Sequence, residues 1–237
     1  MNENKQGKED KELMRVRNRH EYYRTVQYLL LKSLAGYNTS LKLSFLEKFM
    51  DLSLSDVADV VHILGGIFRA DFNKILKAGD GIYENSEIEY AQFLLFRCLK
   101  LLFREPSTSS FLLVSAFLDI LVLTGCEKVE CFRFVFIVDF CFTVLYKRFF
   151  WMIFNSVEDY QNLQQFCNEF LKHFTRDSTL SELRNIRVGA KWINIVQHCV
   201  DAIDVNFSLT GGEVKWFEHY YAKKKPYGMQ IGRHAKN

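Results

Sequence analysis

The chain has 237 residues, of which 49% are hydrophobic and 15% aromatic, and its formal net charge is +3. A chain of this length and composition can bury a substantial core, which excludes disordered, collagenous and repetitive proteins. The net charge is too small to imply a strongly basic surface, so binding to nucleic acid would require the cations to be concentrated in one place.

The chain ends differ in composition from the rest. We divide the sequence into a polar amino-terminal segment (1–12), one domain (13–222) and a basic tail (223–237). No basic and apolar leader with a small-residue cleavage site opens the chain, so we expect an intracellular, cytoplasmic protein that is not secreted. We therefore expect reduced thiols at the six cysteines, which are Cys98, Cys126, Cys131, Cys141, Cys167 and Cys199.

Helix signals recur along the domain. Leucine and phenylalanine are spaced at helical intervals, the chain has 2 Pro, and four segments begin with a capping residue followed by an acidic one. These pairs are Ser53 with Asp56, Ser86 with Glu89, Ser156 with Asp159, and Thr179 with Glu182. The pattern predicts an all-α globular bundle of about eight helices. No repeat period emerges, which ranks an armadillo-like or HEAT-like helical array as the alternative.

Two stretches are apolar enough to be tested as membrane spans. Residues 109–125 contain Asp119 and are shorter than the roughly 20 apolar residues that a span needs. Residues 132–154 contain four charged side chains, each of which would cost about 2.5 to 3.5 kcal/mol at a bilayer centre. We therefore predict that 109–125 is a buried central helix of the domain.

No pattern in the chain indicates catalysis or a metal. The closest Cys and His spacings are Cys126 with Cys131, Cys167 with His173, and His198 with Cys199, and none forms a paired zinc site. There is no GxSxG, Gly-rich phosphate loop or HExxH, so we assign no enzyme activity and no cofactor. For the carboxylates in the apolar stretches, Asp119 and Asp139, paired or groove-lining roles are favoured over poised acids.

The segment ILKAGDGIYEN resembles the death motif of the Bcl-2 family of apoptosis regulators, which are helical bundles built around a hydrophobic central helix. The matching residues are Ile75, Ala78, Gly79, Asp80 and Ile82. In that motif the glycine permits close approach of helices and the aspartate meets a basic partner. Without the resemblance, the same residues predict a helix that ends at Gly79 and is followed by a turn.

Three further segments, read in order, are similar to other homology regions of that family. The first is an amino-terminal helix that ends at Gly36-Tyr37, and the second is a segment with Phe103 and Arg104 that leads into the central helix. The third is a closing Gly-Gly-aromatic motif made of Gly211, Gly212, Trp216 and Tyr220.

The sequence also departs from the family's pattern. The Asn-Trp-Gly-Arg element expected near 108–111 is missing, so the arginine that would receive a ligand's aspartate has no counterpart there. Roughly thirty extra residues separate the central helix from the closing motif, more than loop-length priors favour. In place of the family's carboxy-terminal membrane anchor the chain has the basic tail.

The resemblance implies a non-enzymatic regulator of apoptosis that binds amphipathic helical segments of other proteins, including family members, in a groove. The expected groove residues are those named in the death motif, at Phe103 and Arg104, and in the closing motif. The alternative is an α-helical scaffold whose basic tail contacts RNA or a larger assembly. The tail interleaves tyrosine with lysine and arginine, a pattern also compatible with weak peripheral contact with an anionic membrane.

Overall fold

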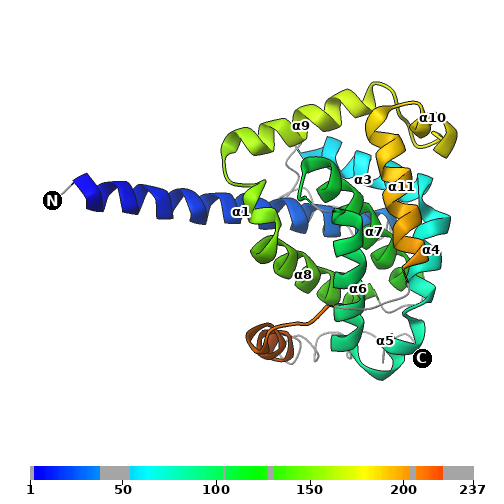
Figure 1. The fold of residues 1–237 in the computed structure, drawn as a ribbon, viewed down its shortest axis with the longest axis horizontal. Coiled ribbons are helices and arrows are strands. Elements are labelled where there is room, and N and C mark those ends of the chain that lie inside the picture. Colours follow the sequence, from blue (N-terminus) through cyan, green and yellow to red (C-terminus); the bar gives the residue numbers. More distant parts are fainter. Residues whose placement is uncertain (1–2, 38–53, 104, 128–130, 203–206, 221–237) are drawn as a thin grey trace.

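The computed structural model describes residues 3–37, 54–103, 105–127, 131–202 and 207–220. All regular structure in these residues is helical, which confirms the all-α prediction. The helices assemble into a bundle, with the amino-terminal half of the first helix projecting beyond it (Figure 1).

The described residues contain more helices than the eight or so that the sequence predicts. The long elements are α1 (Glu3–Tyr37), α3 (Ser55–Ile67), α6 (Glu87–Leu102), α7 (Thr108–Glu127), α8 (Cys131–Arg148), α9 (Val157–Leu171) and α11 (Arg187–Asp201). The short ones are α4 (Arg69–Lys77), α5 (Asp80–Asn85), the 3-10 helix η2 (Phe150–Met152), α10 (Leu180–Arg184) and a helix at 211–220. The count rises because several expected helices are divided by turns of one to three residues.

The centre of the bundle is α7. Residues 110–122 of this helix are all buried, and α7 packs against α1, α3, α4, α6 and α8. Contacts with so many partners on all sides are typical of a globular bundle around a hydrophobic core helix, as the sequence predicts. In the part of the chain that the structure describes, α7 is the one helix with the length and apolar composition of a membrane span, and 78% of that window is buried inside the bundle.

Three of the four predicted helix starts lie within the described residues. Ser156 and Thr179 form complete capping boxes with the residue three positions later. The side chain of Ser86 accepts a hydrogen bond from Glu89 N. Ser53 lies outside the described residues, and α3 begins after Leu54 without a side-chain cap.

The helix that the sequence predicts to begin at Thr179 is short, because the chain is divided here into α10 and α11. The backbone becomes extended at Ile186, the residue that precedes α11. A Cβ placed on Gly189 would lie 1.9 Å from Leu183 O, so the two helices approach too closely for any side chain at this position. Glycine thus allows α11 to turn back against α10 and to lie across the bundle.

The two predicted domain boundaries fall between residues 12 and 13 and between residues 222 and 223. Helix α1 is continuous from Glu3, so the predicted boundary between residues 12 and 13 lies inside one helix. The basic tail at 223–237 lies outside the described residues.

Candidate functional site

The death-motif glycine lies where the end of α4 meets α6. A Cβ on Gly79 would lie 2.6 Å from Phe93 Cε1 and 2.8 Å from Tyr90 Cε2, and both rings belong to α6. Gly79 has φ −100° and ψ −4°, outside the positive-φ region that favours glycine, and it precedes α5. Helix α4 ends at Lys77 and a turn at 78–79 follows it, so the helix end expected without the resemblance is present, although Gly79 does not have the positive φ common at such ends. Space, rather than backbone conformation, requires glycine at this position.

The other motif residues share the same region but differ in burial. Ile75 is buried on α4, and Ile82 is half-buried on α5. Ala78 and Asp80 are exposed, and Asp80 is the first residue of α5. The apolar positions of the motif therefore belong to the core, whereas its carboxylate faces solvent.

An amphipathic helix of the chain itself lies against the same region. Helix α11 packs on both α4 and α6, and Figure 1 shows it beside α4. The buried side chains of α11 after Gly189 are Trp192, Ile195, Val196 and Cys199. Their spacing of i, i+3, i+4 and i+7 is the register by which an amphipathic helix fills a groove.

The largest of these side chains contacts the start of the central helix. Trp192 Nε1 donates a hydrogen bond of 3.0 Å to Ser109 O, and the ring centroid of Trp192 lies 5.9 Å from that of Phe170 on α9. Ser109 lies in the 108–111 segment, where the Asn-Trp-Gly-Arg element of the resembled family is missing. Trp192 of α11 thus contacts the segment near which the resemblance led us to expect that element.

The carboxyl end of α11 is held by a buried arginine on α6. Arg97 is 5% exposed, and its Nη1 donates to Cys199 O at 2.9 Å and to Ala202 O at 2.7 Å. The guanidinium carbon also lies 5.0 Å from the centroid of the Phe93 ring. The last carbonyl groups of a helix lack partners within the helix and carry partial negative charge, so a cation is favoured there.

Sequence reasoning did not single out Arg97, although a signal was present. The helix at 87–102 has a continuous apolar face, and Arg97 interrupts it next to Cys98. A charged residue on a buried helix face requires a specific partner. That argument predicts a polar group opposite Arg97, but it does not identify α11.

The remaining predicted groove residues do not gather around the death motif. Phe103 is exposed and has φ 56°, and it borders a shallow cleft of about 380 Å³ with the outer face of α11. Arg104 lies outside the described residues. Gly211, Gly212, Trp216 and Tyr220 belong to the helix at 211–220, which Figure 1 places away from α4 and α5.

That last helix is instead fixed to α8. The ring of Trp216 stacks on Phe140 with the centroids 5.1 Å apart, and Tyr220 Oη is hydrogen-bonded to Asp139 Oδ2. Asp139 therefore has a paired role, one of the two roles that the sequence favours. The closing motif of the resemblance covers α8 rather than completing a groove beside α4.

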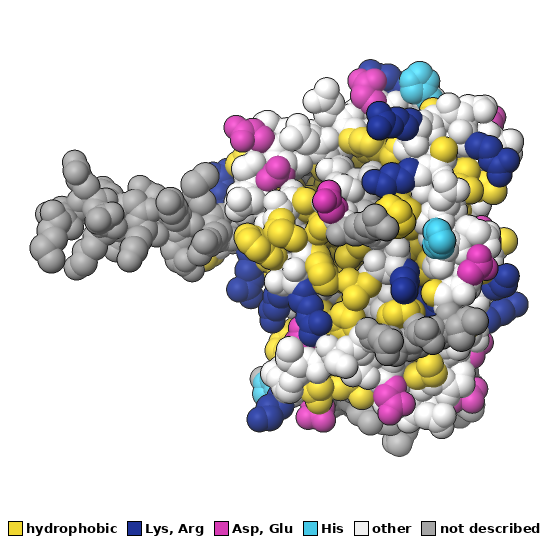
Figure 2. All heavy atoms as spheres, viewed as in Figure 1, with side chains coloured by type: hydrophobic (Ala, Val, Ile, Leu, Met, Phe, Trp, Pro, Cys, Tyr) yellow, Lys and Arg dark blue, Asp and Glu magenta, His cyan; other side chains and the backbone are white. Residues whose placement is uncertain are grey.

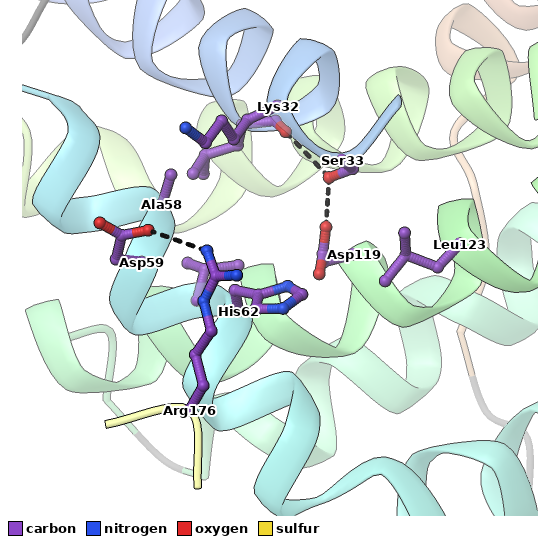
Figure 3. A pocket seen from close by; sticks show the side chains of 10 residues that line it. Lys32, Ser33, Ala58, Asp59, His62, Asp119, Leu123 and Arg176 are labelled. Atoms are coloured by element: carbon purple, nitrogen blue, oxygen red, sulfur yellow. Dashed lines mark hydrogen bonds and ion pairs between the residues drawn. The ribbon is translucent and has the colours of Figure 1, made fainter. Parts of the chain in front are cut away.

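The other carboxylate of the apolar stretches, Asp119, borders a cavity of about 180 Å³ between α1, α3 and α7. The cavity is lined by Leu29, Lys32, Ser33, Ala58, Asp59, Val61, His62, Asp119, Leu123 and Arg176 (Figure 3). Asp119 is hydrogen-bonded to Ser33 Oγ, and at the mouth Arg176 Nη2 lies 3.8 Å from Asp59 Oδ1. Burial raises the pKa of the Asp119 carboxyl, while Ser33 and His62 act in the opposite direction. This groove-lining position agrees with the role that the sequence favours for Asp119.

The described residues show no arrangement typical of nucleophilic catalysis or of a metal centre. Although Ser33, His62 and Asp119 share the cavity, the Ser33 hydroxyl is hydrogen-bonded to Leu29 O and Asp119 Oδ1 rather than to His62, whereas a catalytic serine is activated by a base such as histidine. Burial raises the pKa of the Cys167 and Cys199 thiols to about 12, which disfavours the reactive thiolate. No group of three or more His, Cys, Asp and Glu side chains within the described ranges could hold a metal ion.

Hydrophobic side chains are also visible on the surface of the bundle. The large exposed ones are Val16, Phe103, Trp151, Met152 and Val157. Figure 2 shows hydrophobic side chains between the regions of α9 and α8, with positive side chains at their lower edge. Scattered apolar residues of this kind are usual on soluble proteins, so they do not by themselves define a binding surface.

Comparisons with known proteins do not assign the chain to a family. No family model matches it, and no curated protein or solved structure does so.

Proposed function

We propose that the chain is a non-enzymatic protein-interaction domain that binds an amphipathic helix on the surface formed by α4 and α6. We further propose that it acts as a divergent Bcl-2-like regulator of apoptosis, as the death-motif resemblance implies. The observation that carries the first proposal is the packing of α11 on α4 and α6, with its buried side chains spaced i, i+3, i+4 and i+7 and Trp192 reaching past them to Ser109 of α7. The chain's own helix serves as the model for the ligand.

The contacts of α11 indicate which features a ligand would need. A fully buried large apolar side chain contributes roughly 1.5 to 3 kcal/mol, and Trp192, Ile195 and Val196 are each at most 3% exposed. Arg97 adds hydrogen bonds to the carboxyl end of the helix. A ligand helix would therefore present an aromatic anchor, two aliphatic anchors and a helix end near Arg97.

An external helix would have to replace α11. A tethered segment competes at an effective concentration of about 1 mM or more, so a free peptide with the same contacts is at a disadvantage. No arginine occupies 108–111. We therefore expect binding of an external helix to depend on burial of its apolar side chains rather than on a salt bridge. Partners with stronger anchors than those of α11 would be selected.

The direct test uses a fluorescent peptide of residues 187–202 and full-length protein in which the tethered helix is weakened by Trp192→Ala. We expect the variant to bind this peptide, which retains its tryptophan, with a Kd of about 10 μM. The wild-type protein should bind at least about 10-fold more weakly because its own α11 competes. If Trp192→Ala unfolds the protein, Val196→Ala is the milder replacement.

Two controls isolate the proposed contacts. The variant Gln197→Ala changes an exposed residue of α11 and should behave as the wild type. A peptide with alanine in place of tryptophan should not bind to either protein. If the weakened variant does not bind the peptide below about 100 μM, the helix-binding proposal is wrong.

The apoptosis proposal needs a separate panel. Death-motif helices from Bcl-2-family proteins should compete with the fluorescent peptide for the weakened variant. If the 187–202 peptide binds and none of the death-motif helices competes, the domain binds helices but the family assignment is rejected.

A further inference from the structure

The carboxylate of Asp119 is unusual for its position. It lies on the central helix, where residues 110–122 are all buried, and its side chain is 9% exposed. A buried carboxylate is unfavourable unless it is paired and hydrogen-bonded. The interaction that this residue makes therefore requires an explanation.

Ser33 can provide at most part of that interaction. Its hydroxyl lies 2.9 Å from Leu29 O and is also hydrogen-bonded to Asp119 Oδ1. A serine hydroxyl has one proton, so it fully donates to one of these two acceptors at a time. The second carboxylate oxygen of Asp119 has no hydrogen bond among the described residues, and Figure 3 shows it on the side of His62.

The other charges around the cavity lie nearer to solvent. Arg176 is 70% exposed and pairs with Asp59, whose side chain is 41% exposed. Lys32 and His62 are also exposed. Because exposed charges are screened by water and salt, whereas a buried charge is screened much less, Asp119 is the least screened of the charges around the cavity.

The walls and the size of the cavity limit what can enter. Leu29, Val61 and Leu123 provide apolar surface beside Asp119. An apolar cavity of about 150 Å³ accommodates benzene. A cavity of about 180 Å³ therefore has room for a short alkyl chain that ends in a polar group.

We propose that this cavity binds the ammonium end of an alkylamine, with the Asp119 carboxylate as its anchor and the side chains of Leu29, Val61 and Leu123 around the alkyl chain. The amine is either a free small molecule or a lysine side chain of another protein, since both present the same group. The cavity is formed by α1, α3 and α7, so this proposal stands independently of helix binding to α4 and α6.

The test is a titration of the full-length protein with n-butylammonium chloride, followed by methyl NMR of Leu29, Val61 and Leu123. We expect these methyl signals to shift with a Kd of about 1 mM, as suits a ligand of few atoms. Sodium butyrate, matched in size and ionic strength but opposite in charge, should not shift them. In a second arm, Nα-acetyl-lysine methylamide distinguishes a lysine side chain from a free amine as the ligand.

Matched variants assign the anchor. Asp119→Asn retains the size of the side chain and its ability to accept from Ser33, and should weaken n-butylammonium binding at least about 10-fold. Asp59→Asn, at the mouth, should change binding by less than about 3-fold. If Asp119→Asn does not fold, Ala58→Val replaces it in the test. This variant retains the carboxylate but narrows the cavity, and it should also weaken binding. Equal binding of butyrate, full retention of binding by Asp119→Asn, or no shift at 50 mM of either amine, about fifty times the expected Kd, would overturn the proposal.

Discussion

The two buried charges on opposite sides of the central helix, Arg97 and Asp119, have different surroundings. On the side of α4, α6 and α11, Arg97 donates to two backbone carbonyls and lies over an aromatic ring. On the side of α1 and α3, Asp119 has one hydroxyl partner, which another acceptor shares, and it borders a cavity. The first charge is used to fix a helix in place, and the second remains available to a ligand.

Packing differs between the two sides in the same sense. At Gly79, on the α4–α6 side, there is no room for a single methyl group. Next to Asp119 there is room for a small molecule. Interiors are normally close-packed, so a cavity with a buried carboxylate on its wall is the more informative of the two features.

The largest expected effect comes from a carboxylate placed in the core with neither a hydrogen-bond partner nor a cavity beside it. Leu113 is fully buried on α7. In Leu113→Asp an unpaired charge would be buried, and we expect a loss of more than about 4 kcal/mol, sufficient to abolish cooperative thermal unfolding. Leu113→Met, which conserves volume, should lose less than about 1.5 kcal/mol. A soluble Leu113→Asp protein with wild-type stability would remove α7 from the centre of the bundle.

Substitution of Arg97 tests whether this side chain holds α11 in place. In Arg97→Met the carbonyls of Cys199 and Ala202 lose their donor, and we expect a loss of about 2 to 3 kcal/mol in chemical denaturation. Arg176→Met, which breaks an exposed ion pair at the cavity mouth, should change stability by less than about 1 kcal/mol. Equal effects of the two substitutions would show that Arg97 does not hold α11.

Two glycine substitutions test the difference in packing. Gly79→Ala should destabilise the protein by about 1 to 3 kcal/mol, because the new methyl group would meet the Phe93 and Tyr90 rings. Gly81→Ala, two residues later in α5, meets no atom within 4 Å and should be neutral or stabilising by up to about 1 kcal/mol. Thermal denaturation of both variants in parallel measures the contrast, and a neutral Gly79→Ala would contradict the close contact of α4 with α6.

The smallest expected effect is a pH dependence at Asp119. Burial raises the pKa of this carboxyl in the folded protein above its unfolded value, so the folded state holds the proton more tightly. The contribution of Asp119 to stability is fully present below its pKa in the unfolded chain, about 3.9, and is lost as the pH rises through its pKa in the folded protein. Asp119→Asn cannot ionise, so its stability relative to the wild type should increase over that rise. Urea denaturation at a series of pH values checks this, and a constant difference would contradict it.

The sequence predicts the parts of the fold that local chemistry determines. Capping boxes at Ser156 and Thr179 and the apolar run of α7 were recognisable because each depends on residues close together in the chain. The separation of α10 from α11 could not be recognised in the sequence, because it depends on the contact of Gly189 with the Leu183 carbonyl after the chain has turned.

The candidate sites depend still more on tertiary contacts. The space-limited role of Gly79 follows from the resembled motif, but the occupation of the α4–α6 surface by α11 requires knowledge of the topology. The pair Ser33–Asp119 joins residues 86 positions apart, and Arg97 reaches a carbonyl 102 positions away. No local pattern in the sequence encodes such distant pairings.

The most direct test of the central claim, that α11 occupies a helix-binding surface and can be replaced there, is hydrogen exchange followed by mass spectrometry. We expect the amides of α11 to exchange through local opening, faster than those of α7, which exchange through global unfolding. A saturating concentration of a competing amphipathic helix should accelerate exchange in α11 and leave α7 unchanged. If the peptide binds while exchange in α11 stays as slow as in α7, α11 is a permanent part of the core and the account is contradicted.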